Sequence, residues 1–234
     1  MAYCVRPIMT EFKFVWSHSA LVEFRQCPYK FYRKRVVRDV KEAPTEALEK
    51  GNIVHKMFEE RIKHGTPITA VPRYERMVEP ILRWGGRTAA EVDLGMTRDG
   101  AGTGFFGSSV WGRGKIDVLN LNGNRARVVD WKTGGRVRLE DSRHQAETNA
   151  LLLLANYPNV TAINVVFAYL ELGKVTPYEY TRNDQPRLRA SVDRAFGEVE
   201  YAAEHDMWSK RSSGLCPWCP VTDCPNWKPK PPGR

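Results

Sequence analysis

Two short apolar runs separated by an Asn-Gly turn constrain this chain more than any other part of its sequence. The first run begins at Gly112, the second ends at Gly134, and the turn between them is Asn122-Gly123-Asn124. β-Branched and apolar residues on both sides of an Asn-Gly pair are typical of a β-hairpin. We therefore expect two antiparallel strands, each with one carboxylate near its end: Asp117 on the first strand and Asp130 on the second.

The second strand places a lysine beside its carboxylate. Lys132 follows Asp130 by two positions, and side chains two apart in a strand lie on the same face. Trp131, between them, then points into whatever covers the sheet. Two carboxylates and an ammonium on one face suit a hard divalent cation. The alternative is a surface hairpin with solvated charges, which the buried-looking run Arg127-Val128-Val129 makes less favourable.

The hairpin resembles the catalytic core of the PD-(D/E)XK nuclease superfamily, particularly its RecB-like branch. The pattern there is Gly-x-x-Asp on one strand and Asp/Glu-x-Lys on the next. Here Gly114-Lys115-Ile116-Asp117 and Asp130-Trp131-Lys132 match it. The resemblance implies an α/β fold with a restriction-endonuclease-like core, in which helices flank a central mixed β-sheet.

The same resemblance assigns roles to residues outside the hairpin. His55 ends a Gly-x-x-x-His motif on a predicted core helix. A lone helical histidine is more often structural, but the resemblance of this motif to the first motif of the RecB-like nucleases favours a metal ligand. Glu91 matches an acidic residue ahead of the Gly-x-x-Asp strand, although Asp93 would lie on the same face. Gln145 begins a Gln-x-x-x-Tyr motif in which Asn149 replaces the usual tyrosine. Gln145 would position the nucleic acid strand.

A metal-dependent nuclease is the activity that the resemblance implies. The ligands of Mg²⁺ or Mn²⁺ would be His55, Asp117, Asp130 and the main-chain carbonyl of Trp131. The ion would polarise the scissile phosphate and lower the pKa of a water molecule. Lys132 would orient or help to deprotonate that water and offset charge developing on phosphorus. Glu91 would bind through water or belong to the shell of a second ion.

The cysteines gather near the two ends of the chain: Cys4 and Cys27 at one end, and Cys216, Cys219 and Cys224 at the other. Four thiolates can hold zinc or an iron–sulfur cluster. An early Cys27 joined to the late trio resembles the iron–sulfur nucleases of the RecB-like branch, which include AddB and the CRISPR-adaptation exonucleases. The resemblance favours a 4Fe–4S cluster that ties the two chain ends together, with Zn²⁺ as the alternative. Cys4 would be a free or buried thiol. Cys-Pro-Trp-Cys also resembles a thioredoxin-type redox pair, but it does not open a helix after an early strand.

A glycine-rich segment, Gly102-Thr103-Gly104-Phe105-Phe106-Gly107, satisfies the Gly-x-Gly-x-x-Gly dinucleotide fingerprint. That fingerprint needs a helix directly after it, so that the helix N-terminus meets the phosphate. The residues that follow, from Val110, are strand-like. We therefore expect a turn here and no dinucleotide site.

Composition indicates an ordinary folded protein with a surplus of positive charge. Of the 234 residues, 42% are hydrophobic and 27% charged, and the formal net charge is +9. A basic surplus favours a polyanionic partner, and the metal-site pattern makes nucleic acid the expected one. The basic run Arg33, Lys34, Arg35, Arg38 and Lys41 would be either a solvated helix end or a track for phosphates. No apolar run approaches the ~20 residues that span a bilayer, and no signal peptide is evident, so we expect a cytoplasmic protein.

We expect a single nuclease domain over residues 1–234. Residues 1–43 would form an N-terminal segment carrying the first cluster cysteine, and residues 44–208 the nuclease core. Residues 209–228 would form the cysteine-rich segment, and the basic, proline-rich tail 229–234 would be disordered.

A metal-dependent DNA nuclease, acting as an exonuclease on DNA ends or single strands in repair or recombination, is the function we favour. One alternative is a non-catalytic DNA-end-binding subunit with the same fold. Another is a zinc-stapled protein that binds RNA. The complete set of Asp117, Asp130 and Lys132 argues against the first alternative, because a binding module has no need of it.

Overall fold

The computed structural model describes residues 14–229. Cys4 and residues 230–234 of the expected tail lie outside the described residues. The chain divides into two compact units. The larger unit consists of residues 44–192, and the smaller one combines the two chain ends, residues 14–43 and 193–229.

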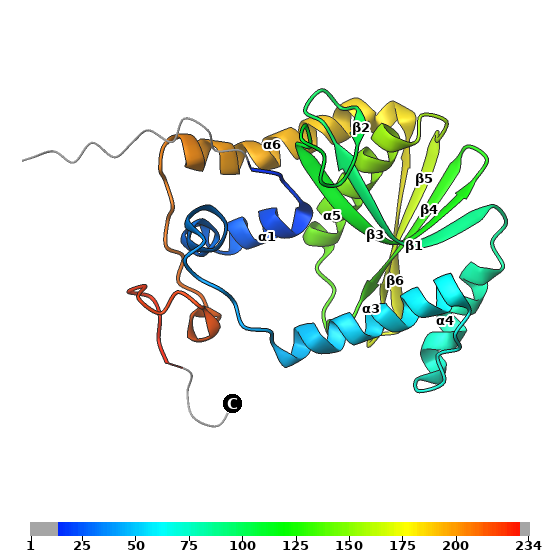
Figure 1. The fold of residues 1–234 in the computed structure, drawn as a ribbon, viewed down its shortest axis with the longest axis horizontal. Coiled ribbons are helices and arrows are strands. Elements are labelled where there is room, and N and C mark those ends of the chain that lie inside the picture. Colours follow the sequence, from blue (N-terminus) through cyan, green and yellow to red (C-terminus); the bar gives the residue numbers. More distant parts are fainter. Residues whose placement is uncertain (1–13, 230–234) are drawn as a thin grey trace, which may run out of the picture. The chain divides into compact units, whose positions relative to one another are not determined.

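A mixed β-sheet forms the centre of the larger unit, and the described residues contribute six strands to it (Figure 1). The strands are β1 (Arg87–Met96), β2 (Gly102–Thr103), β3 (Gly112–Asn122), β4 (Arg125–Lys132), β5 (Ala162–Tyr169) and β6 (Lys174–Thr181). Their order is β2-β1-β3-β4-β5-β6, and all neighbours are antiparallel except β4 and β5. The parallel pair is joined through helix α5 (Leu139–Asn156), the crossover such a pair requires. The predicted α/β fold, with helices flanking a central mixed sheet, is confirmed.

Strands β3 and β4 are the predicted hairpin. Gly123, in the turn, has a φ of 59°, a left-handed conformation that glycine adopts without steric cost. The register pairs Asn122 with Arg125 and Val118 with Val129. Asp117, just before Val118, and Asp130, just after Val129, are the next residues toward the open end of the hairpin. The two carboxylates therefore start from adjacent positions.

Helices α3 (Glu46–His64) and α4 (Pro72–Leu82) pack on the sheet. Thr45 caps α3 by accepting a hydrogen bond from the Leu48 amide. The ring of Phe58 on α3 stacks on Trp131 of β4 at a centroid distance of 4.0 Å. Trp131 is therefore buried in the apolar core. Its packing holds the last residues of β4 in place, with Asp130 directly before Trp131 and Lys132 directly after it.

Helix α5 approaches β3 closely at Gly114. A Cβ atom at that position would lie 2.8 Å from Cδ1 of Leu152, which is fully buried. A larger residue there would force the buried Leu152 side chain to shift. The glycine of the Gly-x-x-Asp motif is thus explained by packing, and it sets α5 beside the strand that carries Asp117.

The smaller unit contains short helices from both ends of the chain. They are α1 (His18–Gln26), α2 (Pro28–Phe31), the π-helical turn η1 (Tyr32–Val37) and the 3₁₀ turn η3 (Cys216–Trp218). The last long helix, α6 (Gln185–Glu204), follows the turn η2 (Arg182–Asp184) and contributes residues to both units. Cys27-Pro28 interrupts the first helix: Cys27 is extended, and Pro28, which cannot continue the hydrogen-bond ladder, begins α2. Among the described residues, no helix is long and apolar enough to cross a membrane.

We predict that Gly114→Ala destabilises the protein by about 1–3 kcal/mol, because the added methyl group overpacks a filled site. Gly135→Ala is the matched control in the same unit: nothing lies within 4 Å of its Cβ position, and its stability should change by less than about 0.5 kcal/mol. Urea unfolding measures both. Equal stability of the two variants would show that α5 can move away from β3.

Candidate active site

Three side chains with metal-ligand chemistry meet where helix α3 contacts the middle of strands β1 and β3. They are His55 on α3, Glu91 on β1 and Asp117 on β3, and one potential ligand atom from each lies within 4.8 Å of the others. An imidazole nitrogen and two carboxylate oxygens suit a hard divalent cation. These residues are far apart in the sequence, so the fold alone brings them together.

The main chain of Trp131 ties Asp117 and His55 into one network. Its amide donates to Oδ2 of Asp117 at 2.8 Å, and its carbonyl oxygen lies 3.0 Å from Nε2 of His55. Nδ1 of the same imidazole lies 3.3 Å from Oδ2 of Asp117. The Asp117 carboxylate raises the pKa of His55 above its ordinary value, since it stabilises the imidazolium form. The carbonyl predicted as a metal ligand is thus part of this cluster.

Asp130 forms a closed set of contacts with Lys132 and Gln145. Its Oδ2 accepts from Nε2 of Gln145 at 2.7 Å, and Nζ of Lys132 donates to Oε1 of Gln145 at 2.7 Å. Nζ of Lys132 also lies 2.7 Å from Oδ1 of Asp130. Only 5% of Asp130 is exposed, and burial raises its pKa; the lysine opposes this shift, and the Asp117 carboxylate adds to it. Oδ1 thus contacts the Lys132 ammonium, and because a carboxylate oxygen has two lone pairs, it can still bind a cation.

Glu91 enters the cluster through an unusual backbone conformation. Its φ is 55°, although it is not a glycine, and it stands opposite Asp117 between the pairs Ala90–Val118 and Val92–Ile116. Burial, followed by the Asp117 carboxylate, raises the pKa of Glu91. A left-handed backbone conformation at a non-glycine residue is energetically costly, and such conformations occur preferentially at functional sites.

The structure separates the two acidic residues that the strand pattern left equivalent. Asp93 is exposed; its Oδ1 lies 3.7 Å from Nζ of Lys115, and Asp93 does not belong to the group formed by His55, Glu91 and Asp117. Glu91 is the one that joins His55 and Asp117. No local pattern signals the left-handed residue, which is why alternation alone could not choose between them.

Two predicted site residues on α5 have surroundings that the sequence did not indicate. The amide of Gln145 engages Asp130 and Lys132, so it orients protein groups; contact with nucleic acid stays a prediction. Asn149 lies one turn further on and is 4% exposed. Its Nδ2 has no hydrogen-bond partner among the described residues. Asn149 is therefore enclosed beside Gly114 rather than presented for stacking.

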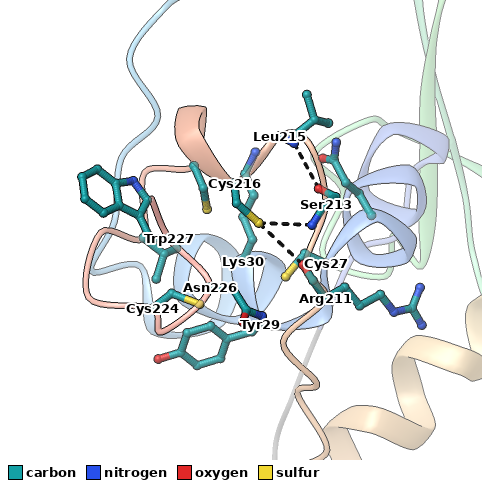
Figure 2. Close-up of a pocket in the computed structure, with 13 residues that line it drawn as sticks. Cys27, Tyr29, Lys30, Arg211, Ser213, Leu215, Cys216, Cys224, Asn226 and Trp227 are labelled. Atoms are coloured by element: carbon teal, nitrogen blue, oxygen red, sulfur yellow. Dashed lines mark hydrogen bonds between the residues drawn. The ribbon is translucent and has the colours of Figure 1, made fainter. Parts of the chain in front are cut away.

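The four cysteines expected to share a metal centre line one cavity of about 40 Å³ in the smaller unit (Figure 2). Cys27 comes from the junction of α1 and α2, Cys216 and Cys219 border η3, and Cys224 follows. Figure 2 shows the sulfur atoms of Cys27, Cys216 and Cys224 around a common space. Burial raises the pKa of the Cys219 thiol, and the neighbouring Cys27 and Cys216 act in the same direction.

Three residues of the basic run, Arg33, Lys34 and Arg35, are neutralised within the smaller unit. Arg33 pairs with Asp39 at 2.8 Å and with Asp223 at 2.9 Å. The two basic residues that follow pair with the acidic side chains of the same unit; these pairs are Lys34–Glu23, Lys34–Glu42 and Arg35–Glu23. These charges hold chain segments together, and Arg33 fixes the residue next to Cys224. Arg33, Lys34 and Arg35 are therefore not an open track for phosphates.

Residues 15–224 match the PD-(D/E)XK nuclease superfamily. The match includes His55, Glu91 and Asp117, here called the carboxylate cluster, and all four of these cysteines. The chain belongs to this superfamily, as the hairpin motif predicted.

Two solved structures are similar to this chain at low sequence identity. A provisionally named exonuclease from Eubacterium rectale is similar with a TM-score of 0.53 and 12% identity, over 88% of this chain and 87% of that one. The structure of SSO0001 is similar with a TM-score of 0.47 and 16% identity, over 92% and 87% of the two chains. No curated protein matches the sequence.

We predict that Glu91→Gly is more stable than Glu91→Ala by about 1 kcal/mol in metal-free protein, because glycine relieves the left-handed strain and alanine does not. Two residues further along β1, Asp93→Ala should be more stable than Asp93→Gly, which is the usual order in a strand. Thermal melting of the four variants measures this. The same order at both positions would contradict the strained backbone at Glu91.

Proposed function

We propose that this protein is a metal-dependent DNA nuclease of the RecB-like branch, acting as an exonuclease on DNA ends or single strands. The observation that carries the proposal is the convergence of His55, Glu91 and Asp117 beside the Asp130–Lys132 pair. Membership of the superfamily supports a nuclease. The provisional name of the Eubacterium rectale protein is consistent with action at strand ends.

The residues present fit a divalent cation. The group that would hold Mg²⁺ or Mn²⁺ is His55, Asp117, Asp130 and the carbonyl of Trp131, with Glu91 as a direct or water-bridged ligand. Oδ1 of the buried Asp130 contacts Lys132 and, with two lone pairs, can also bind the ion. When bound, the ion polarises the scissile phosphate and makes the attacking water more acidic.

Lys132 supplies a fixed positive charge next to the carboxylates. Its ammonium is held by Oδ1 of Asp130 and Oε1 of Gln145, and it lies 5.1 Å from the centroid of the Phe167 ring. Three fixed neighbours leave the ammonium little freedom. A charge already in place stabilises the extra negative charge that appears on phosphorus as the bond to water forms. Gln145 acts through Asp130 and Lys132 and is a positioning residue.

We predict that Asp117→Asn and Asp130→Asn each lower the rate of DNA digestion in Mg²⁺ or Mn²⁺ by more than about 100-fold, because even outer-shell partners of a metal site cost 10–100-fold. An asparagine at residue 117 can still accept from the Trp131 amide, so DNA binding and the fold should persist. Asp93→Asn is the control, as that carboxylate lies outside the cluster.

The digestion assay uses single-stranded and duplex DNA with free and blocked ends. Digestion by Asp117→Asn at the wild-type rate would show that the site is assigned wrongly. A wild-type protein that binds DNA ends but digests nothing in either metal would instead favour a non-catalytic end-binding subunit. Preferential digestion or binding of RNA would favour the third class, an RNA-binding protein.

We further propose that Cys27, Cys216, Cys219 and Cys224 hold a 4Fe–4S cluster that joins the two ends of the chain. Four thiols around one cavity fit such a group, and they equally fit Zn²⁺, which is the alternative. The early cysteine and late trio of the iron–sulfur RecB-like nucleases favour the cluster. Because the cysteines come from distant segments, metal binding would contribute directly to folding free energy.

We predict that replacing any one of the four cysteines by serine lowers metal content and melting temperature together, whereas Cys4→Ser changes neither. Iron, sulfide and zinc analysis with thermal melting measures both quantities without relying on activity. Full metal content in Cys27→Ser would refute a shared centre. Zinc without sulfide in the wild-type protein would keep the centre and replace the cluster.

A further inference from the structure

The loop between β2 and β3 displays two phenylalanine rings around one guanidinium. The rings of Phe105 and Phe106 meet edge to face at a centroid distance of 4.9 Å. Cζ of Arg113 lies 4.7 Å from the centroid of the Phe105 ring and 5.3 Å from that of Phe106. Nη1 of Arg113 also donates to the main-chain oxygen of Phe105. We call Phe105, Phe106 and Arg113 the aromatic platform.

The platform is held in place and open at the same time. Phe106 is 81% exposed, although its ring contacts both Phe105 and Arg113. A single exposed aromatic side chain is ordinary. A pair of rings fixed by a cation differs from that case, because its conformation is set before any partner arrives. A flat apolar face beside a positive charge is the chemical complement of a nucleobase and its phosphate.

Basic side chains lead from the platform to the carboxylate cluster. Arg113 and Lys115 are two residues apart on β3, so they lie on the same face of the strand. Nζ of Lys115 lies 3.4 Å from Oε2 of Glu91, which belongs to the cluster with Asp117. Asp117 lies four positions after Arg113, or roughly 13 Å along β3. A strand of nucleic acid that extends from the platform to Asp117 would lie next to the positive charges of Arg113 and Lys115.

A second set of cation–aromatic contacts adds charge next to the platform. Cζ of Arg98 lies 5.7 Å and Cζ of Arg189 lies 4.5 Å from ring centroids of Trp111, two residues before Arg113. Arg189 also lines a groove of about 560 Å³. The Trp111 ring itself is buried and cannot receive a base, so it anchors the two arginines.

We propose that the aromatic platform stacks an unpaired base of single-stranded DNA a few nucleotides from the carboxylate cluster. The inference rests on the proposed nuclease function, because Arg113 and Lys115 lie between the platform and the carboxylate cluster proposed to cleave DNA. Bases inside a duplex are stacked on both faces, whereas an unpaired base can leave the stack and offer a face, so the platform selects single strands over duplex. The glycine-rich segment that contains Phe105 and Phe106 thus carries a base-binding loop where its spacing suggested a dinucleotide site.

Fluorescence anisotropy with full-length protein, without added divalent metal ion, tests this. Phe106→Leu keeps apolar bulk and removes the aromatic face, and should weaken binding of a single-stranded oligonucleotide about tenfold. Phe106→Trp should bind at least as tightly as the wild type. Val175→Ala, which alters a 63% exposed side chain elsewhere in the same unit, should leave affinity unchanged. Affinity for a blunt duplex of the same length should be equal in all four proteins.

Abasic scanning locates the stacked base. Single abasic sites moved along the oligonucleotide should weaken binding by the wild type at one position and cause no further loss in Phe106→Leu. Equal losses on single strands and duplex, or a flat abasic scan, would overturn the platform. These binding results are independent of cleavage: retained digestion by Asp117→Asn would refute the proposed function and leave the platform, and unchanged binding by Phe106→Leu would do the reverse.

Discussion

The approach of Asp117 and Asp130 at the open end of one hairpin is the constraint on which the site depends. Two carboxylates in a partly buried place repel each other, and burial opposes their ionisation. His55 offsets the first charge, and Lys132 with Gln145 offsets the second. The compensation is incomplete, because the pKa values of His55, Glu91 and Asp130 are all raised. The site therefore favours extra positive charge, which protons or a cation can supply.

Two backbone features make this concentration of charge possible. Gly114 lets α5 approach β3, and α5 carries the Gln145 that holds both Asp130 and Lys132. Glu91 adopts a left-handed conformation that turns a third carboxylate toward His55 and Asp117. Strain of this kind persists only where the surrounding structure enforces it. Here the residues before and after Glu91, Ala90 and Val92, are both paired with β3 and enforce it.

The positive charge of the chain serves different purposes in its two units. In the smaller unit, Arg33 and its neighbours pair with acidic side chains and hold segments together beside the cysteines. In the larger unit, Arg113 and Lys115 lie between the exposed aromatic rings and the carboxylate cluster. A net charge of +9 indicates a polyanionic partner but cannot show which basic residues meet it.

The sequence by itself determined the β3–β4 hairpin and the break at Cys27-Pro28, because turn chemistry, strand alternation and proline act over a few residues. The mixed α/β fold was implied by the resemblance of the hairpin motifs to the PD-(D/E)XK superfamily. The sequence also indicated Asp117, Asp130, Lys132 and His55 as candidates through short motifs. Only the tertiary structure selected Glu91 over Asp93, since a left-handed residue breaks the alternation that made them equivalent. Likewise, the ion pair of Arg33 with Asp223 and the shared cavity of the cysteines depend on contacts between segments far apart in the chain, which local patterns cannot encode.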